Sequence, residues 1–171
     1  GKGAYGTGNM KFMLDGAITI GTLDGAYVEI QEEVGRDNIF IFGLTAKETY
    51  EWSQGGYNPR ELYQKDPILH QVLDQLVNGF LSPDDPELFR EIYDSLVTTS
   101  TGKADEYFIL QDFNAYKKTQ EDIQTAYQNA SRWAEMAILN TAHSGKFSAD
   151  RTIEQYVRDI WKLKKVPIVK V

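Results

Sequence analysis

The segment Gly6-Thr7-Gly8-Asn9-Met10-Lys11-Phe12-Met13-Leu14 places two glycines directly before a helix-forming run. Glycine permits a positive φ and the close approach of a ligand to the backbone. Thr7 or Asn9 can cap the helix that begins here, and the amides of a helix N-terminus attract anions such as phosphate. Lys11 follows on the first turns of this helix. The residues alone leave two interpretations open, which are a phosphate-binding turn beside a reactive lysine, or a capped turn followed by a solvated lysine.

Strand and helix patterns alternate after this turn. Residues 17–22 and 38–42 are rich in β-branched and aromatic residues, which predicts two buried strands. The second is apolar throughout, as in parallel sheets covered on both faces. Residues 26–33 between them have helical spacing, and Gly35 is a plausible stop. A second helix is expected over 45–52, with Thr45 and Glu48 as a capping box. The alternation predicts an α/β fold.

The remaining chain is predicted to be mostly helical. Helices are expected over 60–64, 67–78, 87–96, 130–141 and 148–163, and another from Asp112 or Asn114 to about 127. A short strand is expected over 107–110, and the tail over 166–171 is expected to be strand-like or loose. Loops are expected over 55–59, 82–86 and 98–103. A doubly wound sheet normally has five or six strands. We therefore expect residues 6–56 to be the last part of such a sheet, with its other strands before residue 1. Apolar surface on the helices should then be exposed.

Composition limits the classes of protein. The chain has 171 residues, 42% of them hydrophobic, which suits one folded domain. A net charge of −7 argues against nucleic acid or an anionic membrane as partner. With no cysteine and two histidines, a thiolate or histidine-rich metal site is not expected. No membrane span or signal peptide is apparent, and a cytoplasmic location is expected. The start Gly1-Lys2-Gly3, without methionine, suggests a piece of a longer protein.

Several segments of the sequence resemble segments of one family, the glycogen, starch and maltodextrin phosphorylases. The longest resembles their pyridoxal-phosphate signature and runs from residue 6 to 26, through Asp15-Gly16-Ala17 and Thr19-Ile20-Gly21-Thr22-Leu23-Asp24-Gly25-Ala26. Shorter matches are Asn38-Ile39-Phe40-Ile41-Phe42-Gly43, Asn78-Gly79-Phe80 with Ser82-Pro83, and Ser144-Gly145-Lys146-Phe147-Ser148 with Asp150-Arg151-Thr152-Ile153. The resemblance covers residues 6 to about 161, and it corresponds to the C-terminal end of such an enzyme.

The resemblance implies a fold and an activity. The fold would be the C-terminal portion of a Rossmann-like domain of the GT-B type with a helix-rich second half, residues 1–171 being part of the cofactor-binding domain. The activity would be that of a pyridoxal-phosphate-dependent glycosyltransferase, which reversibly phosphorolyses a terminal α-1,4-linked glucose to glucose 1-phosphate. The partners would be α-1,4-glucan, inorganic phosphate, the remainder of the phosphorylase chain and, in the full enzyme, a second copy in a homodimer. The isolated chain is expected to be inactive.

Roles for individual residues also follow from the resemblance. Lys11 would bind pyridoxal phosphate covalently, and Gly6, Thr7 and Gly8 would hold its phosphate. Lys11 and Thr7 would be the catalytic residues of this part, and the amide of Gly6 would face the sugar or substrate phosphate. No metal ligand is implied.

The chain departs from the family at a few positions. Gly3-Ala4-Tyr5 stands where the family has Glu-Ala-Ser, which leaves three interpretations open: a junction within residues 1–5, a poorly determined sequence or a divergent sugar site. Tyr27 and Asp15 stand where asparagine is expected or common. These changes affect sugar binding more than cofactor binding. The alternative function is that of a nucleotide-sugar glucosyltransferase, or of a non-catalytic domain of this type, with Lys11 free.

Other candidate residues have simpler interpretations. Asp24 is either a carboxylate at a strand end, where α/β sites gather, or the first residue of a turn. His70 and His143 are expected to be structural. Tyr50, Trp52, Tyr57 and Tyr63 could form a platform for sugar rings, but packing is the simpler expectation at helical spacing.

Overall fold

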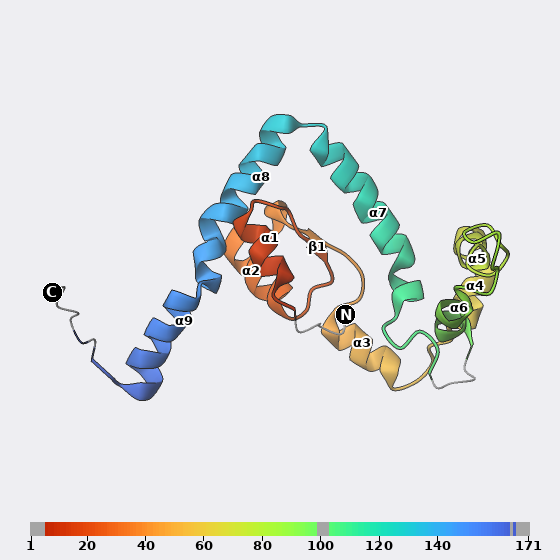
Figure 1. Cartoon of the computed structure of the whole chain (residues 1–171), viewed down its shortest axis with the longest axis horizontal. Helices are drawn as coiled ribbons and strands as arrows, with labels where there is room; N and C mark the ends of the chain where they lie inside the picture. Colours follow the sequence, from red (N-terminus) through yellow and green to blue (C-terminus); the bar gives the residue numbers. More distant parts are fainter. Residues whose placement is uncertain (1–5, 99–102, 165, 167–171) are drawn as a thin grey trace.

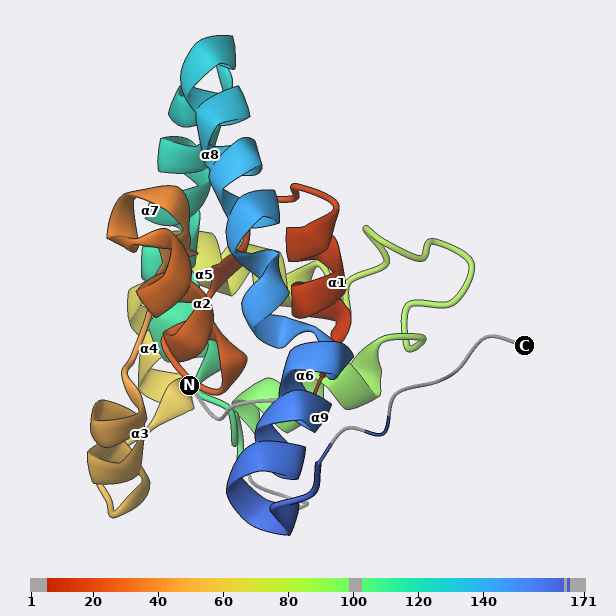
Figure 2. The ribbon, with the colours of Figure 1, turned by 90° about the vertical axis from the view of Figure 1, so that its left-hand side faces the viewer.

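The computed structural model describes residues 6–98, 103–164 and 166. Two long helices, α7 (Ile109–Tyr127) and α8 (Ala130–His143), meet at an angle above the other elements (Figure 1). The short helices α1 (Gly8–Leu14) and α2 (Ala26–Val34) lie beside α8, and Figure 2 shows α8 between them. The helices α4 (Pro59–Lys65), α5 (Pro67–Asp74) and α6 (Arg90–Val97) form one end, and α9 (Ala149–Gln155) the other.

The sheet is small and parallel. Strand β1 (Ile20–Gly21) pairs with β2 (Phe40–Ile41), in the register Ile20 to Phe40 and Gly21 to Ile41. The predicted strands lie in the right places, but each is only two residues long, and the prediction that they are buried is wrong for all of their residues except Gly21. The described part of the chain is thus mostly helical with a two-stranded parallel sheet, which is compatible with part of an α/β domain.

The prediction of a strand over residues 107–110 is wrong, because a helix begins within this range. Phe108 adopts a left-handed conformation with φ 59°, and α7 begins at Ile109. The buried carboxylate of Asp105 accepts hydrogen bonds from the amides of Ile109 and Leu110, both at 2.8 Å. Because this side chain caps the helix, α7 starts before Asp112, which we expected to be a candidate first residue.

The other predicted helices are present with shifted ends. The capping box of α3 (Ala46–Ser53) is confirmed, since Thr45 Oγ1 accepts from the amide of Glu48 and the Glu48 carboxylate accepts from the amide of Thr45. Ser148 caps α9 as predicted. A π-helical segment, η3 (Tyr156–Trp161), continues α9. Residues 99–102 of the predicted polar loop, and 167–171 of the tail, lie outside the described residues. In the part of the chain that the structure describes, no helix is long and apolar enough to span a bilayer.

Two separate apolar cores hold these helices. The first joins α1, α2 and the loop before β2 through Met13, Ile30, Val34 and Ile39. The second joins α5, α6 and α7 through Leu69, Leu73, Val97 and Leu110. Several large apolar side chains outside both cores are exposed, including Ile153, Ile160 and Trp161 near the C-terminal end. This agrees with the expected apolar surface.

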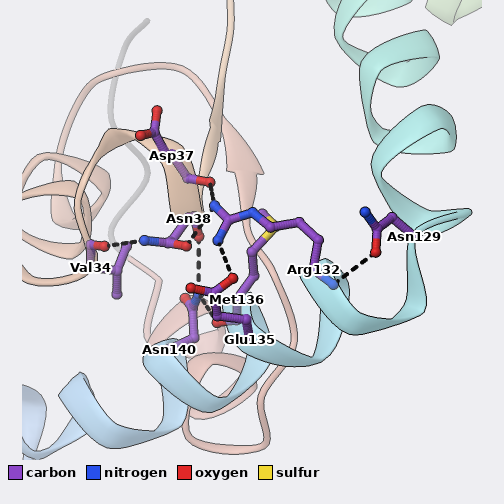
Figure 3. A network of polar contacts seen from close by, with 8 residues as sticks. All are labelled: Val34, Asp37, Asn38, Asn129, Arg132, Glu135, Met136 and Asn140. Carbon is purple, nitrogen blue, oxygen red and sulfur yellow. Dashed lines mark hydrogen bonds and ion pairs between the residues drawn. The ribbon is translucent and has the colours of Figure 1, made fainter.

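A polar network attaches α8 to the short helix η1 (Arg36–Asn38), which leads into β2 (Figure 3). The Arg132 guanidinium donates to the carbonyl of Asp37 at 2.7 Å and to Asn38 Oδ1 at 3.0 Å. The Asn140 side chain donates from Nδ2 to the backbone carbonyls of Asn38 and Met136, both at 2.9 Å. The side chain of Asn140 is fully buried, so these bonds replace contacts with water. The network holds the chain in place as it enters β2.

Asp66 caps α5, and its replacement by alanine should weaken the fold. Its carboxylate accepts from the amides of Ile68 and Leu69 at 2.9 and 3.1 Å, and from the Asn114 side chain at 2.8 Å. We expect Asp66→Ala to reduce the free energy of unfolding by about 1–2 kcal/mol at neutral pH. Asp66→Asn, which keeps an acceptor oxygen, should lose less. Urea unfolding followed by tryptophan fluorescence measures both, and equal losses would contradict the capping role.

The same cap predicts a pH dependence. The hydrogen bond from Asn114, and then that from the Leu69 amide, lowers the pKa of Asp66 below its usual value. A carboxyl group with a lowered pKa in the folded state stabilises the fold above its unfolded-state pKa. This stabilisation is lost as the pH falls through the folded-state pKa. The stability difference between wild type and Asp66→Ala should therefore shrink in acid, and a constant difference would refute this.

Candidate functional site

The N-terminal turn of α1 offers unpaired hydrogen-bond donors. Thr7 occupies the N-cap position, but its side chain makes no capping bond. Asn9 Oδ1 accepts from the amide of Met10 at 2.9 Å. The amides of Gly8 and Asn9 and the Thr7 hydroxyl therefore have no partner among the residues that the structure describes. Donors left free at a helix start are suited to an anion.

Both glycines of this turn leave room for a ligand. A Cβ built on Gly6 would meet no atom within 4 Å, and one built on Gly8 would meet only the Phe12 ring at 3.9 Å. Both residues and Thr7 are exposed. A group larger than water can therefore approach the backbone of Gly6, Thr7 and Gly8.

Lys11 lies one helical turn beyond Thr7. Its amide donates to the carbonyl of Thr7 at 3.3 Å, so the two residues are stacked along the helix axis. Lys11 is exposed, and its ammonium group makes no ion pair within residues 6–98, 103–164 and 166. The structure thus brings Lys11, Thr7, Gly6 and Gly8 onto one short segment.

The opposite side of α1 is anchored in the first core. Met13 is fully buried against Ile30 and Val34 of α2 and against Ile39, which directly precedes β2. Gly16, two residues after the end of α1, has φ 78° and donates from its amide to the carbonyl of Met13, while the amide of Ala17 donates to that of Phe12. This pair of bonds forms a Schellman motif, which requires a left-handed residue. A Cβ on Gly16 would lie 3.2 Å from Thr141 Oγ1, so the end of α1 packs closely on α8.

The residues that depart from the family pattern have different structural surroundings. Gly3, Ala4 and Tyr5 lie outside the described residues. Tyr27 packs against the first core and covers Gly21, where a Cβ would lie 2.6 Å from its ring. Asp15 is exposed at the C-cap of α1. Tyr27 is therefore accommodated by the glycine opposite it in β1.

Asp24 lies in a turn at the end of β1. Its side chain accepts from the Thr22 hydroxyl at 2.8 Å, and its carbonyl accepts from the amide of Tyr27 at 3.1 Å. These bonds agree with the turn interpretation.

The histidines and most of the aromatic residues have structural surroundings. His143 and Lys146 lie 3.7 and 3.5 Å from the Glu33 carboxylate. Tyr57 packs edge-on to Trp52 and tilted on Phe108, and burial raises its pKa above the usual range. The Tyr63 ring stacks on His70. Tyr57 and Tyr63 are thus packed rather than available as a sugar platform, and among the described residues no acidic, histidine or cysteine side chains gather into a metal site.

Asp112 is a buried carboxylate that the sequence analysis noted only as a possible helix start. Its Oδ1 accepts from the amide of Leu44 at 2.8 Å, just beyond the carboxyl end of β2, and burial raises its pKa. It borders a hollow of about 470 Å³ that Thr22, Phe42 and Tyr116 also line. Asp112 and Leu44 are far apart in the chain, and no local pattern reveals the contact.

Gly43 is required beside this carboxylate. It has φ 71°, and a Cβ there would lie 2.5 Å from Asp112 Cγ. Gly56 has φ 88° with nothing within 4 Å of such a Cβ, so it is a matched control. We expect Gly43→Ala to reduce the free energy of unfolding by about 1–3 kcal/mol more than Gly56→Ala in urea titrations. Equal losses would show that only the backbone conformation matters.

The comparisons with known proteins agree on one family. The family model described as carbohydrate phosphorylase matches residues 1–163. The glycogen phosphorylase of Bacillus subtilis (strain 168) is 52% identical over 164 residues, which are 95% of this chain and 20% of the relative. That of Synechocystis is 49% identical over 168 residues, 98% and 19% of the two chains. The human muscle form is 48% identical over 161 residues, 94% and 18%. The chain spans about a fifth of the length of these relatives.

Proposed function

Because this chain belongs to the carbohydrate phosphorylase family, we propose that it is the C-terminal, cofactor-binding part of an α-1,4-glucan phosphorylase. The reaction is the reversible phosphorolysis of a terminal glucose to glucose 1-phosphate. The observation that carries this proposal is the open turn before α1, with Lys11 one helical turn beyond it. The substrates are α-1,4-glucan and inorganic phosphate, and the protein is cytoplasmic and a homodimer. The 171-residue chain alone is inactive, since most of the cleft belongs to other parts of the protein.

The residues present fit pyridoxal phosphate. The free amides of Gly8 and Asn9 and the Thr7 hydroxyl supply donors for its phosphate, and the bare backbone at Gly6 leaves space beside it. The Lys11 amine would attach to its aldehyde carbon. Lys11 is the fourth residue of the seven-residue helix α1, and helical side chains lean toward the N-terminus, so its amine can reach a phosphate held at the helix start.

The proposal assigns a role to the residues of the turn before α1 and to those that anchor the helix. When bound, the cofactor supplies a phosphate group that exchanges a proton with the substrate phosphate. Thr7 and the neighbouring amides orient that group and offset the repulsion between two phosphates held close together. Gly6 offers its amide toward the sugar or substrate phosphate. Met13 and Gly16 fix the helix that carries these groups against the core.

The fold assignment is part of the same proposal. The parallel pair β1 and β2 and the helices around it would be the last part of a Rossmann-like domain of the GT-B type, over residues 6–56. Residues 57–171 would be its helical extension, and the segment around 148–163 would return toward the first domain. Preceding strands of the protein would complete the sheet.

The test is direct detection of the cofactor in the complete protein that contains this chain. We expect a pyridoxal absorbance band, a borohydride-reduced adduct that peptide mass mapping places on Lys11, and release of glucose 1-phosphate from maltodextrin with phosphate. A nucleotide-sugar glucosyltransferase or a non-catalytic domain of this architecture would give neither band nor adduct. An adduct on another lysine would refute the role of Lys11.

A further inference from the structure

The side chain of Asn140 carries a buried oxygen without a hydrogen-bond partner. Asn140 lies on α8 and is fully buried, and its nitrogen makes the two hydrogen bonds shown in Figure 3. Its Oδ1 has no hydrogen-bond partner among the residues that the structure describes. Because a buried acceptor without a partner destabilises a fold, an apolar side chain of similar size could serve stability at least as well. The asparagine therefore points to a role in geometry rather than in stability.

The two hydrogen bonds of Asn140 join α8 to the chain that enters β2. Its Nδ2 donates to the carbonyl of Met136, four residues earlier on the same helix, which fixes the orientation of the side chain. The same nitrogen donates to the carbonyl of Asn38, which is 102 positions away in the sequence. The Asn38 side chain is itself held, because its Nδ2 donates to the carbonyl of Val34 at 2.7 Å. The link therefore connects α8 with the end of α2 and with the backbone directly before β2.

Helix α1 is too short to fix its own position. It has seven residues, and helices of this length depend on packing against their neighbours. One support of α1 is the first core, in which Met13 packs with Ile39. Ile39 directly follows Asn38, so this support is attached to the link that Asn140 makes.

A further support of α1 is α8 itself. The backbone at Gly16 lies close to this helix, since a Cβ built there would be 3.6 Å from Ala137 Cβ and 3.2 Å from Thr141 Oγ1. Thr141 directly follows Asn140 in α8, and Ala137 lies three residues before it. Asn140 therefore joins the helix on which the end of α1 rests to the segment against which Met13 packs.

We propose that Asn140 is a positioning residue for phosphorolysis, because it fixes these two supports of α1 against each other and so places the Lys11 amine. Its relevance to the reaction rests on the function proposed above, while the link from α8 to Asn38 is independent of any cofactor. Lys11 is exposed, so the backbone of α1 determines where its side chain begins. A displacement of about 1 Å at a reacting group can lower a rate about a hundredfold. Asn140 acts through α1 and does not touch the reacting groups.

The test compares Asn140→Leu with wild type in the complete protein. Leucine has a similar size but cannot donate to the carbonyl of Asn38. We expect kcat for maltopentaose phosphorolysis to fall about tenfold, while KM changes less than about twofold and the pyridoxal absorbance band keeps its intensity. In the apoprotein, hydrogen exchange in the peptide over residues 6–17 should be about fivefold faster than in wild type. The exchange measurement does not depend on activity.

A second variant and a control separate positioning from stability. Asn140→Ser should reproduce both changes, because a serine hydroxyl can donate to the Met136 carbonyl within α8 but is shorter than the carboxamide that reaches Asn38. Asp66→Ala is the control, since it removes the cap of α5 in the region of the second core. It should keep the kcat of wild type and the exchange rate of residues 6–17. Thermal melts establish that the variants fold.

The outcomes distinguish this proposal from the proposed function. Wild-type kcat and exchange in both Asn140 variants would overturn it, and so would faster exchange without a change in kcat. Equal changes in Asp66→Ala would also overturn it, because they would assign the effects to lost stability. A wild type without the cofactor band and without phosphorolysis would refute the proposed function instead. Faster exchange confined to the Asn140 variants would then still support Asn140 as the residue that positions α1.

Discussion

Replacing Lys11 with alanine in the complete protein is expected to remove the covalently bound cofactor and at least about a thousandfold of the phosphorolysis rate. The cofactor would lose its only covalent attachment, and the open turn at Gly6–Gly8 would have to hold it by hydrogen bonds alone. The loss of the absorbance band and an assay of glucose 1-phosphate release measure the two effects.

The fold should not be affected by this change. Lys11 is exposed and makes no ion pair with the described residues, and alanine is a better helix former than lysine. The free energy of unfolding of the apoprotein should stay within about 0.5 kcal/mol of wild type. Lys47→Ala, at another exposed helical lysine, is the control and should keep full activity. Full activity in Lys11→Ala would refute the proposed function.

The largest effect on stability is expected for Met13→Ala. Met13 is fully buried where α1 meets α2 and the segment entering β2, and it contacts the cluster of Ile30, Val34 and Ile39. Truncation leaves a cavity that the surrounding helices can fill only in part. We expect a loss of about 2–5 kcal/mol in the free energy of unfolding, measured by urea titration.

Leu14→Ala is the matched control for this prediction. Leu14 follows Met13 on the same helix, but its side chain is 59% exposed. Its truncation should cost less than about 1 kcal/mol. A similar loss in both variants would show that α1 responds to helix propensity rather than to core packing. Because α1 carries Lys11, Met13→Ala should also weaken cofactor retention in the complete protein.

Local chemistry made much of this structure predictable. A capping box such as Thr45 with Glu48 needs only residues three apart, and the glycine-bounded turn before α1 needs only its own residues. The strand positions and their parallel pairing followed from the apolar runs. The prediction at 107–110 failed because Asp105, a cap buried by tertiary contacts, outweighed the strand propensity of Tyr107 and Phe108.

The sequence by itself determined the family, the helical segments and the grouping of Gly6, Thr7, Gly8 and Lys11, because all of these depend on neighbours in the chain. Only the tertiary structure decided that Asn140 and Arg132 hold the entry to β2, and that Asp112 occupies the space beside Gly43. Contacts between Asn140 and Asn38, or between Asp112 and Leu44, join residues far apart in the chain. Such contacts leave no periodic signal, because they form only when helices pack against one another.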